Sequence, residues 1–161
     1  MNPSVVILAL VTLERLGELW LSNRNSKRLL AQGGHEVATG HYPLIVGLHV
    51  LWLAVLWWLA PGQSIDGFWL GLYVLLQVAR FWTIEALGPR WTTRIIVLPD
   101  APLVTRGPYR FIDHPNYLVV AGEIAVLPLV FGLWQVALIF SVLNAAVLWV
   151  RIREENRALG R

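Results

Sequence analysis

The sequence predicts an all-α integral membrane protein with five transmembrane helices, the last two forming a helical hairpin. Apolar residues (Ala, Val, Ile, Leu, Met, Phe, Trp, Tyr and Cys) make up 57% of its 161 residues, and charged residues only 14%. A water-soluble domain of this length needs more charge to keep its surface hydrated. Long apolar stretches and a one-sided distribution of Lys and Arg indicate the same class. The length fits a single domain over residues 1–161.

Four apolar stretches are long enough to enter a bilayer, because about 20 helical residues cross a ~30 Å hydrocarbon core. They are residues 3–21, 42–60, 66–87 and 117–150. The last stretch, at ~1.5 Å per residue, would reach ~50 Å as one helix, which is too long for one crossing. Gly132 near its middle predicts a tight turn between two shorter helices. Charged residues late in the first stretch favour a retained helix over a cleaved signal peptide.

The basic residues predict the orientation of these helices. The segment 61–65 and the predicted turn near Gly132 hold no Lys or Arg, whereas eleven of the 13 basic residues fall in three segments that the topology places together: Arg24, Lys27, Arg28, Arg90, Arg94, Arg106, Arg110, Arg151, Arg153, Arg157 and Arg161. Since cytoplasmic loops are rich in Lys and Arg, the N-terminus is expected outside and the C-terminus in the cytoplasm. Topology therefore explains the net charge of +3, and no nucleic-acid partner is predicted.

Ionisable residues within the predicted membrane helices gather in their cytoplasmic halves: Glu14, Arg15, Glu18, His49, Arg80, Glu85 and Glu123. Such residues are costly in a bilayer and are usually paired or functional. The chain has no cysteine, which excludes a thiolate nucleophile, a disulfide and a Cys-ligated metal, and no metal site is predicted.

Residues 88–116 form the longest non-membrane segment, and prolines stiffen it: Pro89, Pro99, Pro102, Pro108 and Pro115. A stiff loop indicates a shaped binding surface at the membrane. Near the other end of the chain, Arg151 and Glu155 are four residues apart and share one helix face. The alternative for this helix end is a basic collar that reaches toward the headgroups, with a surface ion pair.

Three motifs together resemble the isoprenylcysteine carboxyl methyltransferase family over about residues 80–160: Leu103-Val104-x-x-Gly107-Pro108-Tyr109, His114-Pro115-Asn116-Tyr117, and Arg151-Ile152-x-Glu154-Glu155 after an apolar hairpin. The N-terminal half carries a narrower likeness at residues 18–25, 33–36 and 41–43. It is similar to the bacterial branch that O-methylates alkylpyrones and related polyketide lipids, which implies a multi-pass protein of the bacterial inner membrane.

The resemblance implies methyl transfer from S-adenosylmethionine to an oxygen (carboxylate, enol or phenol) of a lipophilic small molecule. It assigns the cofactor-binding residues as Ala101, Pro102, Leu103, Val104, Tyr109, His114, Pro115, Asn116, Tyr117 and Glu155. Arg151 matches the family's substrate-orienting arginine. The family usually has Arg before the His-Pro pair, where this chain has Asp113. If that Arg supports the cofactor pocket, its role passes to Arg110 or Arg94 or is missing.

Such a transfer depends on positioning more than on acid–base chemistry. We expect the polar cofactor to enter from the cytoplasm and the acceptor from the membrane lipids. A carboxylate or acidic enol needs no base, whereas a phenol benefits from one. The candidate bases are Glu14, Glu18, His49 and Glu123.

Three alternatives stay open at this point. One is carboxyl methylation of an isoprenylated cysteine at the same kind of site. Another is an NADPH-dependent membrane reductase, since some such enzymes have a similar C-terminal arrangement. A non-enzymatic membrane scaffold is the third, and it leaves the stiff loop and the Arg/Glu helix end on one face unexplained. The sequence itself defines neither the acceptor nor an oligomeric state.

Overall fold

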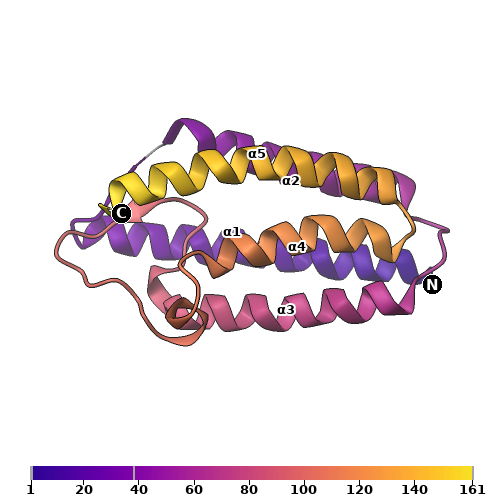
Figure 1. The fold of residues 1–161 in the computed structure, drawn as a ribbon, viewed down its shortest axis with the longest axis horizontal. Helices are drawn as coiled ribbons and strands as arrows, with labels where there is room; N and C mark the ends of the chain where they lie inside the picture. Colours follow the sequence, from indigo (N-terminus) through magenta and orange to yellow (C-terminus); the bar gives the residue numbers. More distant parts are fainter. Residues whose placement is uncertain (1, 38, 161) are drawn as a thin grey trace.

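The structure is a computed structural model that describes residues 2–37 and 39–160, and within them five α-helices run along one long axis (Figure 1). The α-helices are α1 (Pro3–Ala31), α2 (Tyr42–Leu59), α3 (Gly67–Leu87), α4 (Pro115–Val130) and α5 (Trp134–Ala158). Short 3-10 helices are η1 (Thr39–His41), η2 (Gly88–Arg90) and η3 (Gly107–Arg110), and two strands are β1 (His35–Glu36) and β2 (Ile96–Val97).

Three of these segments are long and apolar enough to cross a membrane: Tyr42–Leu59, Gly67–Arg90 and Trp134–Ala158. In their most apolar windows only 11% to 28% of the residues are buried within the protein, so most of these residues are at least partly exposed at its surface. Helix α4 is apolar but has 16 residues, and α1 carries the charged residues noted above. The predicted membrane protein is therefore supported by three spans, while five crossings stay a prediction.

The first helix differs most from the prediction. The apolar stretch indicated an end near residue 21, but α1 continues to Ala31. No Gly or Pro interrupts residues 22–31, so the helix extends beyond its apolar part. Asn2 and Pro3 start α1, with the Asn2 Oδ1 accepting from Ser4 N at 3.0 Å. The added turns reach the loop that follows α3.

Helices α3 and α4 approach closely, and α4 turns back into α5. A Cβ on Gly122 would lie 2.8 Å from Leu76 Cδ2, so a larger residue there would require the Leu76 side chain to shift. The chain reverses at residues 131–133, where Gly132 has φ +71°, a conformation that favours glycine. The core of the bundle is apolar and includes Leu8, Leu56, Ile124, Leu127 and Phe131.

The two ends of the bundle differ (Figure 1). The N-terminus lies at one end, and the long loop after α3 lies at the other, together with the C-terminal end of α5. At that end β1 and β2 pair antiparallel, with His35 opposite Val97 and Glu36 opposite Ile96. The all-α prediction missed this small sheet because its two strands are far apart in the sequence. The sheet ties the connection after α1 to the long loop.

Candidate functional site

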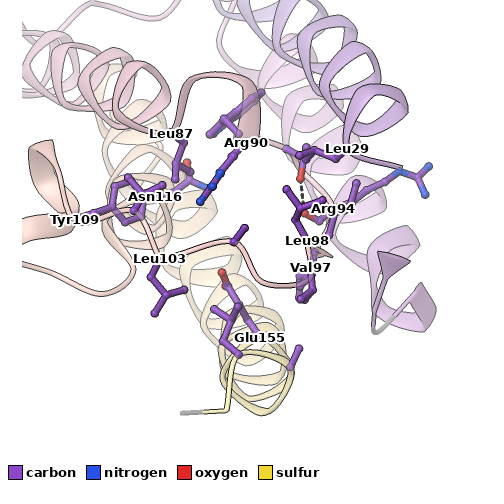
Figure 2. Close-up of a pocket in the computed structure, with 18 of the residues that line it drawn as sticks. Leu29, Leu87, Arg90, Arg94, Val97, Leu98, Leu103, Tyr109, Asn116 and Glu155 are labelled. Carbon is purple, nitrogen blue, oxygen red and sulfur yellow. Dashed lines mark hydrogen bonds between the residues drawn. The ribbon is translucent and has the colours of Figure 1, made fainter. Parts of the chain in front are cut away.

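A cavity of about 410 Å³ opens at the loop-bearing end of the bundle (Figure 2). Its walls are the loop segment 90–104, the start of α4 and the last turns of α5. This volume lies within the usual range of ligand sites, roughly 300–1,000 Å³. Ten of the eleven residues that the sequence assigned to the cofactor or acceptor line it: Ala101, Pro102, Leu103, Val104, Tyr109, His114, Asn116, Tyr117, Arg151 and Glu155.

Pro115 is the assigned residue that does not line the cavity. It occupies the first position of α4, where its missing N–H and fixed φ suit a helix start. The preceding residue, His114, has a non-helical conformation (φ −129°, ψ 58°). Pro115 therefore starts α4 so that His114, Asn116 and Tyr117 reach the cavity from its first turn.

The sharp approach of η3 to α3 depends on Gly107. Its φ is +58°, and an added Cβ would lie 2.9 Å from Ala86 Cβ. Both the backbone conformation and the close contact require glycine here. Tyr109 follows two residues later in η3 and faces the cavity (Figure 2).

Arg151, Tyr117 and Glu155 form a hydrogen-bonded group on one wall. Tyr117 donates its hydroxyl to Glu155 Oε2 and accepts from Arg151 Nε at 2.8 Å. Arg151 Nη2 donates to the Thr93 carbonyl at 2.6 Å, and the residue is 5% exposed. The guanidinium is thus fixed by neutral oxygens, and the tyrosine hydroxyl links it to the Glu155 carboxylate. This arrangement leaves Arg151 available to an acceptor with negative charge.

His114 lies against Tyr117 and beside two polar residues of α5. Its ring stacks on Tyr117 with centroids 5.4 Å apart. The His114 Nε2 atom is 3.0 Å from Asn156 Oδ1, and its Nδ1 is 3.6 Å from Glu155 Oε2. The ring is therefore oriented from both nitrogens. Asn156 was not predicted from the sequence, although its position one residue after Glu155 places it on the same helix turn.

Tyr109 keeps its hydroxyl proton at neutral pH. Burial raises the pKa of this hydroxyl, and the negative charge of Glu155 raises it further. The side chain therefore offers a neutral hydroxyl donor and an aromatic face to whatever occupies the cavity.

Residues 90–98 contribute a wall that the sequence motifs did not indicate. Arg94 lines the cavity, but its Nη1 donates to the Glu36 carboxylate at 2.9 Å and its guanidinium lies 4.4 Å from the Tyr42 ring centroid. The family usually has a positively charged Arg at the position of Asp113, and two arginines were considered as replacements. Arg110 does not line the cavity, and Arg94 is paired with Glu36. Arg90, which was not considered, does line it.

The residues with the narrower N-terminal likeness hold this loop in place. Ser22 Oγ accepts from Thr93 N at 2.9 Å, and Asn25 Nδ2 donates to the Trp91 carbonyl at 2.8 Å. Both side chains come from the polar turns of α1 that lie beyond its apolar part. They position the segment whose Thr93 carbonyl holds Arg151.

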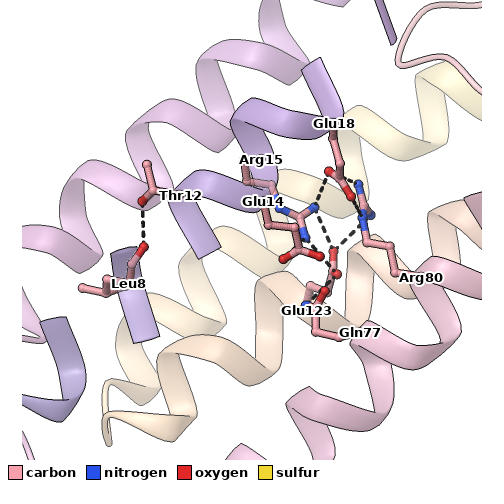
Figure 3. A network of polar contacts seen from close by, with 8 residues as sticks. All are labelled: Leu8, Thr12, Glu14, Arg15, Glu18, Gln77, Arg80 and Glu123. Carbon is pink, nitrogen blue, oxygen red and sulfur yellow. Dashed lines mark hydrogen bonds and ion pairs between the residues drawn. The ribbon is translucent and has the colours of Figure 1, made fainter. Parts of the chain in front are cut away.

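A second group of charges joins helices within the bundle (Figure 3), and none of its charged residues lines the cavity. Arg80 of α3 bonds both Glu18 (Nη2–Oε2, 2.8 Å) and Glu123 (Nη1–Oε2, 3.1 Å). Arg15 pairs with Glu123 at 3.1 Å, with Glu18 at 3.1 Å and with Glu14 at 3.3 Å. The pairing expected for these intramembrane residues is therefore present, and it joins α1, α3 and α4.

None of the four candidate bases lines the cavity. Glu14, Glu18 and Glu123 are engaged with arginines in this second group. His49 Nδ1 lies 2.9 Å from the carbonyl of Ile45 in its own helix. The sequence suggested these residues by their depth and charge, but only the packing separates them from the cavity.

Comparison with known proteins agrees with the family resemblance of the motifs that gather at the cavity. The sequence model of the isoprenylcysteine carboxyl methyltransferase (ICMT) family matches residues 69–161, which include every motif residue of the cavity. The chain therefore belongs to the isoprenylcysteine carboxyl methyltransferase family. Members of this family are membrane proteins that take a methyl group from S-adenosylmethionine.

Two relatives extend the similarity over almost the whole chain. The uncharacterized protein YpbQ of Bacillus subtilis (strain 168) is 35% identical over 159 residues, covering 96% of this chain and 95% of the relative. An uncharacterized protein of Haemophilus influenzae is 25% identical over 160 residues, covering 96% and 93%. No solved structure matches the chain.

Proposed function

We propose that this chain binds S-adenosylmethionine in the cavity between segment 90–104 and the end of α5, and transfers its methyl group to an oxygen of a lipophilic acceptor. One observation carries the proposal: ten of the eleven residues assigned from the family motifs line a single cavity. They come from three separate segments, 101–109, 114–117 and 151–155. Their convergence is what a common ligand requires.

The groups around the cavity suit the chemistry of this cofactor. Asn116 Oδ1 is buried without a hydrogen-bond partner among the described residues, so it can accept from an amino group. Glu155 uses Oε2 for Tyr117 and can accept from ribose hydroxyls or the ammonium through its other oxygen. Apolar side chains such as Leu98 and Leu103 offer contact to an adenine. The residues present therefore fit the cofactor.

When bound, the cofactor supplies an electrophilic methyl group on a positively charged sulfur. The protein's own part is orientation. Tyr109 and Tyr117 offer aromatic faces, which attract a nearby cation as well as a base. Arg151, held by Tyr117 and Thr93, orients an acceptor oxygen that carries negative charge. A carboxylate or acidic enol is already ionised, so no residue of the chain has to remove a proton.

The acceptor we propose is an alkylpyrone-type polyketide lipid that enters from the bilayer. The narrower N-terminal likeness supports this class. Leu103, which lines the cavity and is 46% exposed, offers apolar contact to the chain of any such lipid. The second candidate is the carboxylate of an isoprenylated cysteine, which the family's description favours. Both acceptors combine an acidic oxygen with a long apolar chain.

Cofactor binding is tested by calorimetric titration of the purified full chain with S-adenosylhomocysteine. We expect saturable binding that weakens about tenfold or more in Glu155→Ala and in His114→Ala, because each removes a polar contact of the cavity. Glu154→Ala is the matched control, since Glu154 pairs with Arg157 on the surface and does not line the cavity. Undiminished binding in both cavity variants would contradict the site.

The acceptor is tested by methyl transfer to a panel that holds an alkylpyrone and a farnesylated cysteine. Faster methylation of the alkylpyrone supports the polyketide acceptor, and the reverse favours the cysteine carboxylate. Thermal stabilisation by NADPH and none by S-adenosylhomocysteine would instead indicate the reductase alternative.

A further inference from the structure

A second cavity, of about 460 Å³, lies beside the first at the loop-bearing end, and three arginines line it. Arg28 comes from the last turn of α1, Arg90 from η2, and Arg106 from the residue before η3. No Asp or Glu is among its described lining residues. The cavity is therefore strongly basic.

These three arginines differ from those that hold the bundle together. The ion pairs within residues 2–37 and 39–160 include none of them, whereas Arg15 and Arg80 each contact at least two carboxylates. Arg90 donates to the Pro102 carbonyl at 2.5 Å, and Arg106 donates from Nε to the Ala86 carbonyl at 2.7 Å. A guanidinium has five N–H donors, so most of this donor capacity is left for a ligand.

The helix ends near the cavity do not balance this charge. The C-termini of α1 and α3 lie here, and each contributes an effective charge of about −0.5. Three guanidinium groups against about −1 leave an excess of about +2. An anion with one or two negative charges would neutralise it, and the planar guanidinium fork suits the oxygens of a phosphate group.

The surroundings place such a phosphate at the surface of a membrane. Trp82 of α3 packs beside Gly107 and is 50% exposed, as is common for Trp at the level of lipid headgroups. Leu103 lines the cavity, and both it and Leu30 are 46% exposed. Acyl chains can lie on these apolar side chains while the phosphate faces the arginines. A soluble phosphate would not use them.

We propose that this cavity binds the phosphate headgroup of an anionic phospholipid. Basic pockets at the cytoplasmic ends of membrane helices suit this chemistry. The two cavities adjoin, and seven residues line both: Leu29, Leu87, Arg90, Leu98, Pro102, Leu103 and Val104. A headgroup on Arg90 therefore also braces the segment that lines the first cavity. The proposal concerns lipid binding by the three arginines rather than methyl transfer, and it does not depend on the proposed function.

The test is a binding titration of the purified full chain in detergent, without cofactor. The probes are dihexanoylphosphatidylglycerol, dihexanoylphosphatidylcholine and inorganic phosphate. We expect tight binding of the phosphatidylglycerol and at least tenfold weaker binding of the other two. Charge reversal by Arg28→Glu should weaken phosphatidylglycerol binding about tenfold or more.

Two further variants make the test specific. Thr105→Glu places a carboxylate at the cavity wall without removing an arginine, and it should weaken binding as much as Arg28→Glu. Arg24→Glu removes the same charge one turn earlier on α1, where the side chain lies over Trp20 and outside the cavity, and it should bind as the parent chain does. Equal loss in Arg24→Glu would overturn the proposal in favour of a diffuse basic surface. Equal affinity for inorganic phosphate, or no binding of phosphatidylglycerol, would overturn the lipid assignment.

Discussion

Two groups of residues in this protein both contain arginine and glutamate, one deep in the bundle and one at the first cavity, but their contacts differ. In the deeper group, Arg80 and Arg15 contact carboxylates directly, and each guanidinium serves more than one of them. At the cavity, Arg151 contacts a tyrosine hydroxyl and a backbone carbonyl, and Glu155 is reached only through the tyrosine. Charge that is neutralised within the protein joins helices, whereas charge left partly free is available to a ligand.

Burial determines how much each group contributes to stability. Removing one partner of a buried ion pair leaves the other charge without compensation, which costs far more than breaking an exposed pair. Three helices meet in the deeper group, so its loss affects the whole bundle. The cavity lies at one end, so changes there should affect binding first.

The largest effect is expected from Arg80→Ala. The change removes one of the two guanidinium groups that contact both Glu18 and Glu123, and it leaves Arg15 alone with three carboxylates. The free energy of unfolding should fall by about 3–5 kcal/mol. Thermal unfolding in detergent measures it. The control is Arg157→Ala, whose pair with Glu154 is exposed and should contribute less than about 1 kcal/mol. Similar small shifts in both variants would show that the deeper group does not hold the bundle.

The same substitution in the two groups should give opposite results. Glu155→Gln removes a charged acceptor worth about 1.5–3 kcal/mol, so cofactor affinity should fall about 10- to 100-fold with little change in melting temperature. Glu123→Gln should lower the melting temperature and leave the affinity nearly unchanged. Titration and thermal unfolding of both variants would test this. A loss of affinity in Glu123→Gln at unchanged stability would place that residue in the site.

A smaller effect is expected from Ser22→Ala, which changes a contact between α1 and the loop segment that holds Arg151. Thr93 N–H loses its acceptor, which costs about 1–2 kcal/mol and loosens the segment that holds Arg151. We expect a lower melting temperature and several-fold weaker cofactor binding. Ser26→Ala is the matched control one turn later, because Ser26 Oγ is buried without a hydrogen-bond partner among the described residues. Equal losses in the two variants would contradict the role of Ser22.

The smallest effect concerns Tyr109 and alkaline pH. Its pKa is raised in the folded protein above the usual value of about 10. Above pH 10 the unfolded chain therefore releases this proton while the folded chain keeps it, so stability falls as pH rises. Tyr109→Phe should abolish this part of the loss. Melting temperatures of both chains from pH 8 to 11 measure it, and parallel curves would contradict the assignment.

The bounds of a helix were predicted well where the helix coincides with one uninterrupted apolar stretch. The expected stretch 42–60 nearly coincides with α2, and 66–87 with α3. Gly132 lies between α4 and α5 with φ +71°, and the membrane hairpin stays a prediction. The end of α1 was wrong by ten residues, because a helix continues through polar residues when other segments pack on them. Ser22 and Asn25 provide those contacts.

The sequence pointed to the cavity residues that belong to family motifs and to few of the others that line the cavity. Ten of the residues that the family motifs named line one cavity, and their roles there stay a prediction. Arg90 and the segment 95–98 also line it but carry no motif, so they were not named. The charged residue Arg94, at the edge of an apolar run, was the one available signal for that wall. The candidate bases were chosen by depth in the membrane, and depth does not tell which charges face one another.

By itself, the sequence determined the apolar class of this protein, the approximate positions of its membrane helices and the residues that approach a common cavity. These features follow from composition, length and local spacing, which act along the chain. The tertiary structure alone decided which charges are paired, because Arg80 reaches Glu18 and Glu123 across helices far apart in sequence. It also decided that the ion pairs of the described residues include no arginine of the second cavity. Pairing depends on distance in space, and no periodicity along a single chain encodes it.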